Sequence, residues 1–162
     1  MALDMNNFTS NQNEQSAVKS NRKLRIGIIG TGGISGSHIP AYLRQEDVEL
    51  VAGCDLIPGK AESKFRYYKI EGGKFFTDYK EMIDTVEMDA VSVCTYNSTH
   101  AECAIYALEH GLNVLLEKPF TVTLEEAAAV MRAEKKSGKF VSVGFQPRFD
   151  ANMQMIKKIV QS

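Results

Sequence analysis

The chain has 162 residues, of which 44% are hydrophobic and 24% charged, so it is long enough to bury one ordinary core. Its 19 basic and 20 acidic side chains give a formal net charge of -1, which offers no electrostatic case for a nucleic-acid or membrane-surface partner. No apolar stretch approaches the ~20 residues of a membrane span, and the first residues lack the apolar core of a signal peptide. We expect a cytoplasmic protein whose partner is a small molecule.

Residues 1–21 differ in composition from the rest of the chain. They are rich in Asn, Gln and Ser, and their apolar residues follow neither the helical nor the strand period. Such a segment buries too little apolar surface to offset the entropy of ordering it. The composition predicts a flexible tail.

Beyond this segment, apolar runs alternate with segments of helical periodicity. Six runs predict strands, and they are nearly continuous in hydrophobicity, as strands covered on both faces are. The predicted strands are residues 24–29, 49–54, 74–76, 90–95, 113–116 and 140–144. Alternating strands and helices predict an α/β fold in which a parallel sheet carries helices on both faces. Six strands are the number of a complete doubly wound dinucleotide-binding, or Rossmann, fold.

Two of the predicted helices have clear start and stop signals. In each, apolar residues recur at positions i, i+3, i+4 and i+7, a capping box precedes them and a glycine follows them. The box and stop residues are Thr99, Glu102 and Gly111 in the first helix and Thr123, Glu126 and Gly138 in the second. Residues 33–44, 59–70 and 78–84 predict three further helices. Pro40 should bend the first of these, because proline cannot donate the backbone hydrogen bond.

The last part of the chain has a pattern of its own. Phe149, Met153, Ile156 and Val160 share one face of a helix, and no capping residue or turn signal follows them. We therefore divide the chain into a doubly wound domain at residues 22–147 and a helix at 148–162. We expect that helix to lead toward a second, substrate-binding domain that is absent from this chain.

A glycine-rich turn, Gly-Thr-Gly-Gly-Ile-Ser at residues 30–35, follows the first predicted strand. It matches the dinucleotide-binding pattern G-x-G-x-x-G at the first two glycines and has Ser35 at the third. In that pattern Gly30 permits the tight turn and Gly32 lets the backbone approach a pyrophosphate, while the next helix directs its free N–H groups at the phosphates. Glycines also serve ordinary turns, so the motif alone leaves the ligand open.

Asp55 closes the second predicted strand, 25 residues after Gly30. An acidic side chain at this position accepts hydrogen bonds from the adenosine ribose hydroxyls and repels a 2′-phosphate, which favours NAD over NADP. Leu56 follows where NADP-binding enzymes often carry a basic residue, although Lys60 or Lys64 could still reach the ribose. The alternative interpretation of Asp55 is a helix cap or a solvated turn residue.

The three cysteines, Cys54, Cys94 and Cys103, are odd in number and lack the CxxC spacing of zinc sites. Two of them close apolar runs. The pattern predicts buried free thiols, with neither a disulfide framework nor a metal site.

Several segments resemble the glucose-fructose oxidoreductase, inositol dehydrogenase and MocA-like oxidoreductases. They are residues 26–34, 38–41, 100–101, 117–120 and 144–149, and the resemblance extends over residues 23–160. The most specific segment is Glu-Lys-Pro at residues 117–119. The resemblance implies an NAD(P)-dependent oxidoreductase that acts on CH–OH groups of a sugar, inositol or related polyol. It also implies a homo-oligomeric full-length protein that associates through its second domain, so we expect this piece to be a monomer.

The resemblance assigns roles to individual residues. It places Asn97 near the cofactor diphosphate and nicotinamide ribose, and Glu117 near that same ribose. It places Lys118 beside both nicotinamide and substrate, and Arg148 in a loop that approaches the cofactor.

Two departures from the family pattern leave the contacts of two loops open. Tyr96 stands where a proline is common, and Gln146 stands where an asparagine is frequent. Together, the motif and the resemblance predict cofactor contacts at Gly30, Thr31, Gly32, Gly33, Ile34, Asp55, Thr95, Tyr96, Asn97, His100, Glu117, Lys118 and Arg148.

Lys118 is the predicted catalytic residue. At a strand end beside the nicotinamide, its ammonium can hydrogen-bond a substrate hydroxyl and stabilise the alkoxide that develops as hydride leaves. The alternative is a solvent-facing lysine before a proline turn. His38, His100 and His110 lie on or beside predicted helices, where we expect structural roles for their side chains.

The family's second domain usually supplies an aspartate and a histidine at D-x-x-x-H spacing, and no aspartate of this chain precedes a histidine by four residues. We therefore expect the chain to bind NAD without turning over substrate by itself. A second hypothesis is a non-catalytic regulator that senses NAD, against which the retention of Lys118 argues. A third is a Rossmann domain for coenzyme A or S-adenosylmethionine, which predicts no ribose-directed role for Asp55.

Overall fold

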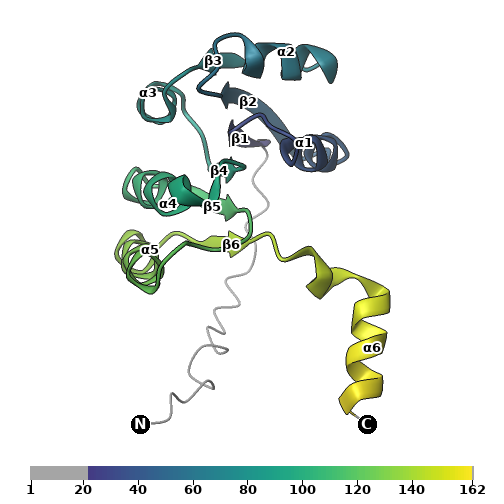
Figure 1. Cartoon of the computed structure of the whole chain (residues 1–162). Coiled ribbons are helices and arrows are strands. Elements are labelled where there is room, and N and C mark those ends of the chain that lie inside the picture. The colour runs from purple at the N-terminus through teal and green to yellow at the C-terminus, as the bar shows by residue number, and fades with distance from the viewer. Residues whose placement is uncertain (1–21, 162) are drawn as a thin grey trace.

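A six-stranded, all-parallel sheet forms the centre of the computed structural model, which describes residues 22–161 (Figure 1). The strands are β1 (Leu24–Ile29), β2 (Val48–Cys54), β3 (Lys74–Phe76), β4 (Ala90–Val93), β5 (Asn113–Leu116) and β6 (Val141–Val143). Their order across the sheet is β3-β2-β1-β4-β5-β6, which is the doubly wound order. The α/β prediction is confirmed. The flexible-tail prediction for residues 1–21 lies outside the described residues.

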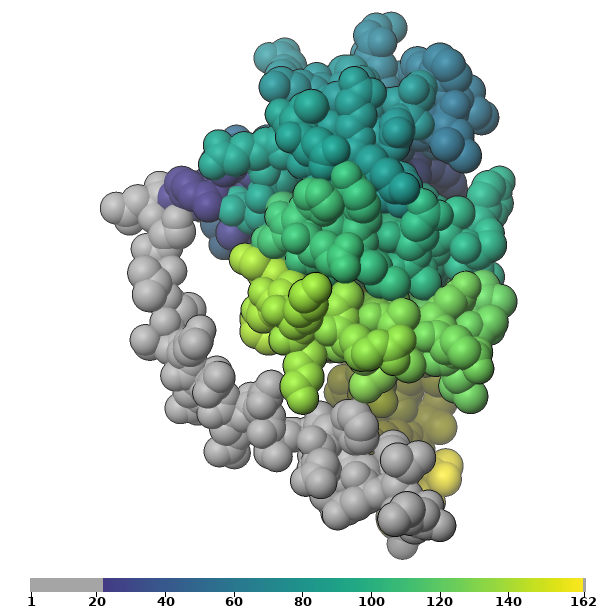
Figure 2. All heavy atoms as spheres, turned by 90° about the vertical axis from the view of Figure 1, so that its left-hand side faces the viewer, coloured from purple at the N-terminus to yellow at the C-terminus, as the bar shows by residue number. Residues whose placement is uncertain are grey.

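Helices cover both faces of the sheet, in agreement with the sequence pattern. They are α1 (Ser35–Leu43), α2 (Lys60–Tyr67), α3 (Tyr79–Thr85), α4 (His100–Glu109), α5 (Leu124–Ser137) and α6 (Ala151–Gln161), with short 3-10 turns η2 (Asn97–Thr99) and η3 (Gln146–Phe149). On β1, Ile26 and Ile28 pack with Ile39 of α1 and Phe65 of α2 in one core. The other core lies under α3, α4 and α5, which Figure 2 shows stacked in chain order.

The sheet order determines where the carboxyl ends of the strands meet. The chain runs outward from β1 to β3 and then returns to β4 on the other side of β1, so the connections diverge between β1 and β4. In open α/β sheets, ligands bind in the crevice at this divergence. Ile29 pairs with both Cys54 and Val93, and Val93 pairs with Leu116, so the residues after all four strands lie along one edge.

One of the two predicted capping boxes is present and the other is not. At the start of α5, Thr123 Oγ1 accepts from Glu126 N at 3.1 Å and the Glu126 carboxylate accepts from Thr123 N at 3.1 Å. At the start of α4 the prediction is wrong, because η2 precedes the helix and Thr99 Oγ1 donates instead to Tyr96 O at 3.0 Å. Glu102 accepts a hydrogen bond from Tyr79 of the neighbouring helix.

Pro40 lies inside α1, within the helix that the sequence pattern predicts. A residue at this position would normally donate its N–H to the carbonyl of Gly36, four residues earlier. The hydroxyl of Tyr68, beyond the end of α2, lies 3.3 Å from Gly36 O and donates to it instead. The helix thus continues past the proline with this carbonyl still paired.

The three cysteines are buried free thiols, as predicted. Helix α6 extends away from the sheet (Figure 1), and apolar side chains such as Ile156 and Ile159 are more than half exposed on it. Within residues 22–161, no helix is both long enough and apolar enough to cross a membrane.

Candidate functional site

The glycine turn between β1 and α1 contains two kinds of glycine. Gly30 has φ +86°, and a Cβ built on it would lie 2.7 Å from Cys94 O, so the fold itself requires glycine there. Gly32 and Gly33 have no atom within 4 Å of a built Cβ. No contact within the described structure therefore requires glycine at these two positions. Open space above the backbone is what close approach by a diphosphate needs.

The start of α1 is open to an anion. Its N-cap is Ile34, which makes no side-chain capping hydrogen bond, and no acidic residue occupies the first turn. The first N–H groups of a helix carry partial positive charge. In α1, Gly36 N and Ser37 N donate to Gly33 O and Ile34 O at 3.0 and 2.9 Å, so an anion would meet the N–H groups of the preceding turn. Ser35 fills the position of the third glycine, and its buried hydroxyl donates to Gly32 O at 2.7 Å. Sequence reasoning treated Ser35 only as a small residue and missed this bond, which closes the turn.

Asp55 follows β2 and is tied to the same turn. One carboxylate oxygen, Oδ2, accepts from Thr31 N and Thr31 Oγ1, each at 2.9 Å, and lies 2.8 Å from Lys60 Nζ. The other, Oδ1, accepts from Ile57 N at 3.1 Å. Burial alone would raise the pKa of Asp55, but the bonds from Lys60, Ile57 N and Thr31 outweigh it and hold the pKa below its ordinary value.

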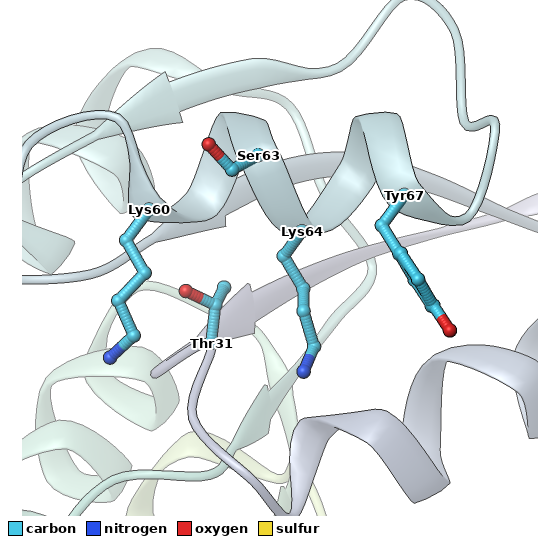
Figure 3. Close-up of a pocket in the computed structure, with 5 residues that line it drawn as sticks. All are labelled: Thr31, Lys60, Ser63, Lys64 and Tyr67. Carbon is cyan, nitrogen blue, oxygen red and sulfur yellow. The ribbon is translucent and has the colours of Figure 1, made fainter.

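A depression of about 400 Å³ opens between the glycine turn and α2, as Figure 3 shows. Thr31, Lys60, Ser63, Lys64 and Tyr67 line it. The two lysines extend from α2 toward the turn, and Tyr67 extends from the same helix toward α1. Lys64 Nζ donates to Gly32 O at 3.2 Å. From the sequence alone, both lysines were expected only to lie within reach of the ribose.

A second group of predicted residues lies beyond β4, β5 and β6. Tyr96 is 86% exposed, and Asn97 in η2 and Arg148 in η3 are also exposed, while Thr95 is partly buried. Lys118 follows β5 and is exposed. Among residues 22–161, the side chains of Lys118 and Arg148 have no hydrogen-bond or ion-pair partner.

Glu117, directly before Lys118, is buried, and both of its carboxylate oxygens have partners. Its Oε1 lies 2.8 Å from His38 Nε2 of α1, and its Oε2 accepts from Lys118 N at 3.1 Å. The other ring nitrogen of His38 lies 2.8 Å from Ser92 Oγ of β4. This buried network links α1, β4 and β5 beneath the exposed lysine. Glu117 therefore fixes the backbone of Lys118, and its oxygens are turned into the protein.

His100 lies in the interior of the protein. Two expectations for it follow from the sequence, a cofactor contact and a structural role, and its side chain is fully buried. Its Nδ1 lies 2.8 Å from Pro119 O and its Nε2 lies 3.3 Å from Thr95 O, both main-chain acceptors. The imidazole joins the two loops that follow β4 and β5, so it has a structural role. At this position the family resemblance falls on a residue that supports the two loops.

Two other chemistries have no support in the described part of the chain. Residues 22–161 contain no cluster of three or more His, Cys, Asp or Glu side chains that could hold a metal ion. Burial raises the pKa of Cys54, Cys94 and Cys103 to about 12 in each case, so these thiols stay protonated at neutral pH and are poor nucleophiles.

Comparison with known proteins identifies the same fold. Residues 24–145 match the GFO/IDH/MocA model, described as an oxidoreductase family with an NAD-binding Rossmann fold. The chain is 35% identical over 141 residues to inositol 2-dehydrogenase of Salmonella typhimurium, covering 86% of this chain and 42% of that protein. It is 34% identical over 147 residues to D-glucoside 3-dehydrogenase of Escherichia coli, covering 90% of this chain and 41% of that protein.

A solved structure gives the same result in three dimensions. The WlbA dehydrogenase from Bordetella pertussis, in complex with NADH and UDP-GlcNAcA, superposes with a TM-score of 0.79 at 29% identity. The match covers 86% of this chain and 42% of that one. The chain thus spans less than half the length of these relatives.

Proposed function

Because the chain belongs to the GFO/IDH/MocA family of oxidoreductases with an NAD-binding Rossmann fold, we propose that it binds NAD as the cofactor domain of a dehydrogenase. The substrate we propose is a sugar, inositol or related polyol, since relatives are named for inositol and D-glucoside. The reaction is hydride transfer between a CH–OH group and the nicotinamide, which the bound cofactor supplies. The chain alone binds the cofactor without turnover.

The observation that carries this proposal is the open backbone at Gly32 and Gly33. It lies at the uncapped start of α1, next to Asp55 on the shared edge of the sheet. A diphosphate fits the first element because helix N-termini bind anions, and a ribose fits the second because a carboxylate accepts from its hydroxyls. Leu56, which directly follows Asp55 and is 84% exposed, provides apolar surface nearby for the adenine base.

The residues beyond β5 support the chemistry that a complete enzyme would perform. Glu117 and His38 hold the Lys118 backbone from inside the protein, so that the ammonium faces outward from the sheet edge. There it can donate to the substrate oxygen and stabilise the negative charge that develops on it. We propose that a second domain, reached through α6, covers this lysine and supplies the proton-transfer group. The exposed apolar residues of α6 are consistent with such a contact.

Isothermal titration of NAD, coenzyme A and S-adenosylmethionine tests the cofactor assignment. We expect NAD to bind the chain and the other two not to, and Asp55→Ala to weaken NAD about tenfold through loss of a charge-assisted hydrogen bond. Asp47→Ala removes an exposed acid away from the site and should leave the affinity unchanged. Undiminished NAD affinity in Asp55→Ala would contradict the ribose assignment, and binding of coenzyme A in place of NAD would contradict the cofactor.

An activity assay tests whether turnover requires the full-length protein and not this chain alone. We expect the 162-residue chain to show no oxidation of inositol or glucosides with NAD, and the full-length protein to oxidise a polyol and to lose this activity in Lys118→Ala. Turnover by the chain alone would overturn the proposal. A full-length protein that binds NAD but oxidises no polyol would instead indicate a regulator.

A further inference from the structure

Three buried polar side chains lie in a line beneath Lys118, from β4 through α1 to the end of β5. Ser92 Oγ lies 2.8 Å from His38 Nδ1, and His38 Nε2 lies 2.8 Å from Glu117 Oε1. All three side chains are buried. Burying such groups is unfavourable unless each has a hydrogen-bond partner, and this line gives each of them one.

The same three residue types form the catalytic triad of many hydrolases, but the arrangement here is different. In a triad the serine faces Nε2 of the histidine and the acid faces Nδ1. Here Ser92 faces Nδ1 of His38 and Glu117 faces Nε2. Ser92 is also fully buried, so its hydroxyl cannot reach a substrate. The line of residues therefore acts on the site from inside the protein.

The hydrogen bonds of this line all point toward Glu117. A carboxylate only accepts, so His38 Nε2 carries the hydrogen of its bond to Glu117. In the neutral ring Nδ1 is then an acceptor, and the Ser92 hydroxyl donates to it. Ser92 thereby selects the tautomer of His38 that can hold the carboxylate.

The Glu117 carboxylate is held on several sides. Its other oxygen, Oε2, accepts from Lys118 N at 3.1 Å, and the Glu117 backbone N donates to Val93 O at 3.1 Å. A Cβ built on Gly144, just after β6, would lie 3.0 Å from Glu117 Oε1, so the carboxylate packs closely on that backbone. The position of the Lys118 backbone thus depends on a carboxylate whose side-chain donor is His38.

We propose that His38 is a positioning residue for hydride transfer, acting on Lys118 through Glu117. The inference rests on the proposed function, because it takes the Lys118 ammonium as the group that stabilises the substrate oxygen. Without the donor at Nε2 the carboxylate can turn away, and the Lys118 backbone loses its acceptor. A displacement of about 1 Å at a reacting group lowers the rate by up to about a hundredfold. Cofactor affinity is set elsewhere, at the glycine turn and Asp55.

Substitutions that keep or remove the donor to Glu117 test this role in the full-length protein. Glutamine places an amide N–H near the position of Nε2, whereas the shorter asparagine reaches only the position of Nδ1. We expect His38→Asn to lower kcat about thirtyfold with the KM for NAD within about twofold, and His38→Gln to keep kcat within about threefold of the wild type. Ile39→Val loosens the same helix at a buried residue without a link to Glu117, and should leave kcat per folded molecule unchanged.

Hydrogen exchange on the 162-residue chain tests the structural link without any turnover. The amide of Lys118 is protected by its bond to Glu117 Oε2. In His38→Asn its exchange should accelerate about tenfold more than that of the β5 amides, which report general loss of stability. In His38→Gln and Ile39→Val, Lys118 should follow the β5 amides.

The outcomes separate this inference from the function on which it rests. Unchanged kcat in His38→Asn, in a full-length protein whose wild type oxidises a polyol, would overturn the inference and leave the proposed function standing. Equal losses of kcat in His38→Asn and His38→Gln would overturn it as well, because the donor to Glu117 would then be irrelevant. Exchange at Lys118 that is the same in His38→Asn and Ile39→Val would overturn the link itself. A wild type that binds NAD but oxidises no polyol would overturn the proposed function, and the role of His38 in hydride transfer with it.

Discussion

The two halves of the proposed cofactor site differ in how much of the structure this chain provides. We define the adenosine half as residues 30–35, Asp55 and the α2 lysines, and the nicotinamide half as residues 95–97, 117–118 and Arg148. In the adenosine half the polar side chains hold one another in place, because Thr31 and Lys60 both bond to Asp55. In the nicotinamide half the organised part, Glu117 with His38, is buried, and the side chains that face outward are exposed.

This difference indicates which part of the proposed cofactor the chain can hold alone. Binding affinity is greatest where the donors and acceptors are already in place, because less ordering is required on association. The adenosine half meets that condition. Exposed side chains such as Lys118 become useful only when a second surface excludes water and restricts them.

The largest effect is expected at Gly30, where the adenosine half meets the fold. Gly30→Ala should lower the free energy of unfolding by about 3 kcal/mol, the sum of a left-handed backbone penalty and a clash with Cys94 O. Gly59 has a similar φ of +77° but open space around a built Cβ, so Gly59→Ala should cost only about 1 kcal/mol. Denaturant unfolding measures both. Equal costs would show that the contact with Cys94 is unimportant.

Gly32→Ala should separate ligand binding from folding. Because a Cβ at Gly32 meets nothing in the protein, thermal stability should not change. The methyl group would occupy the space of the diphosphate, so NAD affinity should fall about thirtyfold, or roughly 2 kcal/mol. Titration and thermal unfolding on the same sample give both numbers. An unchanged NAD affinity would mean that the diphosphate lies elsewhere.

In the nicotinamide half, the buried network should matter for stability and not for cofactor affinity. His38→Leu removes the partner of the buried Glu117 carboxylate and should cost about 2 kcal/mol of unfolding free energy. Ser92→Ala removes the outer member of the network and should cost about 1 kcal/mol. NAD affinity should stay within about threefold in both variants. A tenfold loss of NAD affinity without loss of stability would assign the network to cofactor binding.

The ion pair of the adenosine half predicts a pH dependence. The folded pKa of Asp55 is lower than its ordinary value, so its contribution to stability is present above the ordinary carboxyl pKa of about 4. The contribution is lost as the pH falls through the folded pKa. The wild type should exceed Asp55→Asn by about 1 kcal/mol at pH 7, and the difference should shrink below about pH 4. Denaturant unfolding at several pH values would refute this if the difference stayed constant.

The smallest effect is expected at Lys118. Lys118→Ala should leave the NAD affinity of this chain within about twofold, because the side chain is exposed and has no partner in the described structure. Titration of NAD measures it. A tenfold loss would show that this chain alone already engages the nicotinamide end.

The sequence predicts the adenosine half better than the nicotinamide half, and the reason is distance along the chain. The six strands, the turn and Asp55 follow from local patterns of hydrophobicity and backbone freedom. The Thr99 capping box failed because the η2 turn holds Thr99 at φ -110° and ψ 0°, whereas a capping residue needs an extended backbone. The His38–Glu117 pair joins residues 79 positions apart, and no local pattern reveals it.

His100 and Lys60 are two further residues whose contacts the local sequence does not reveal. The sequence supports both a cofactor contact and a structural role for His100, and it does not show that the imidazole is buried between the carbonyls of Thr95 and Pro119. The spacing of Lys60 from Asp55 permits contact but does not predict the 2.8 Å ion pair. Burial and pairing depend on the assembled edge of the sheet, where four strands end together.

The most direct test of the account compares NAD with two of its fragments on the wild-type chain. ADP-ribose carries the adenosine and both phosphates without the nicotinamide ring, and nicotinamide mononucleotide carries the other end. If the adenosine half holds the cofactor, ADP-ribose should bind within about threefold of NAD and nicotinamide mononucleotide should not bind detectably. Binding of nicotinamide mononucleotide without binding of ADP-ribose would contradict the account.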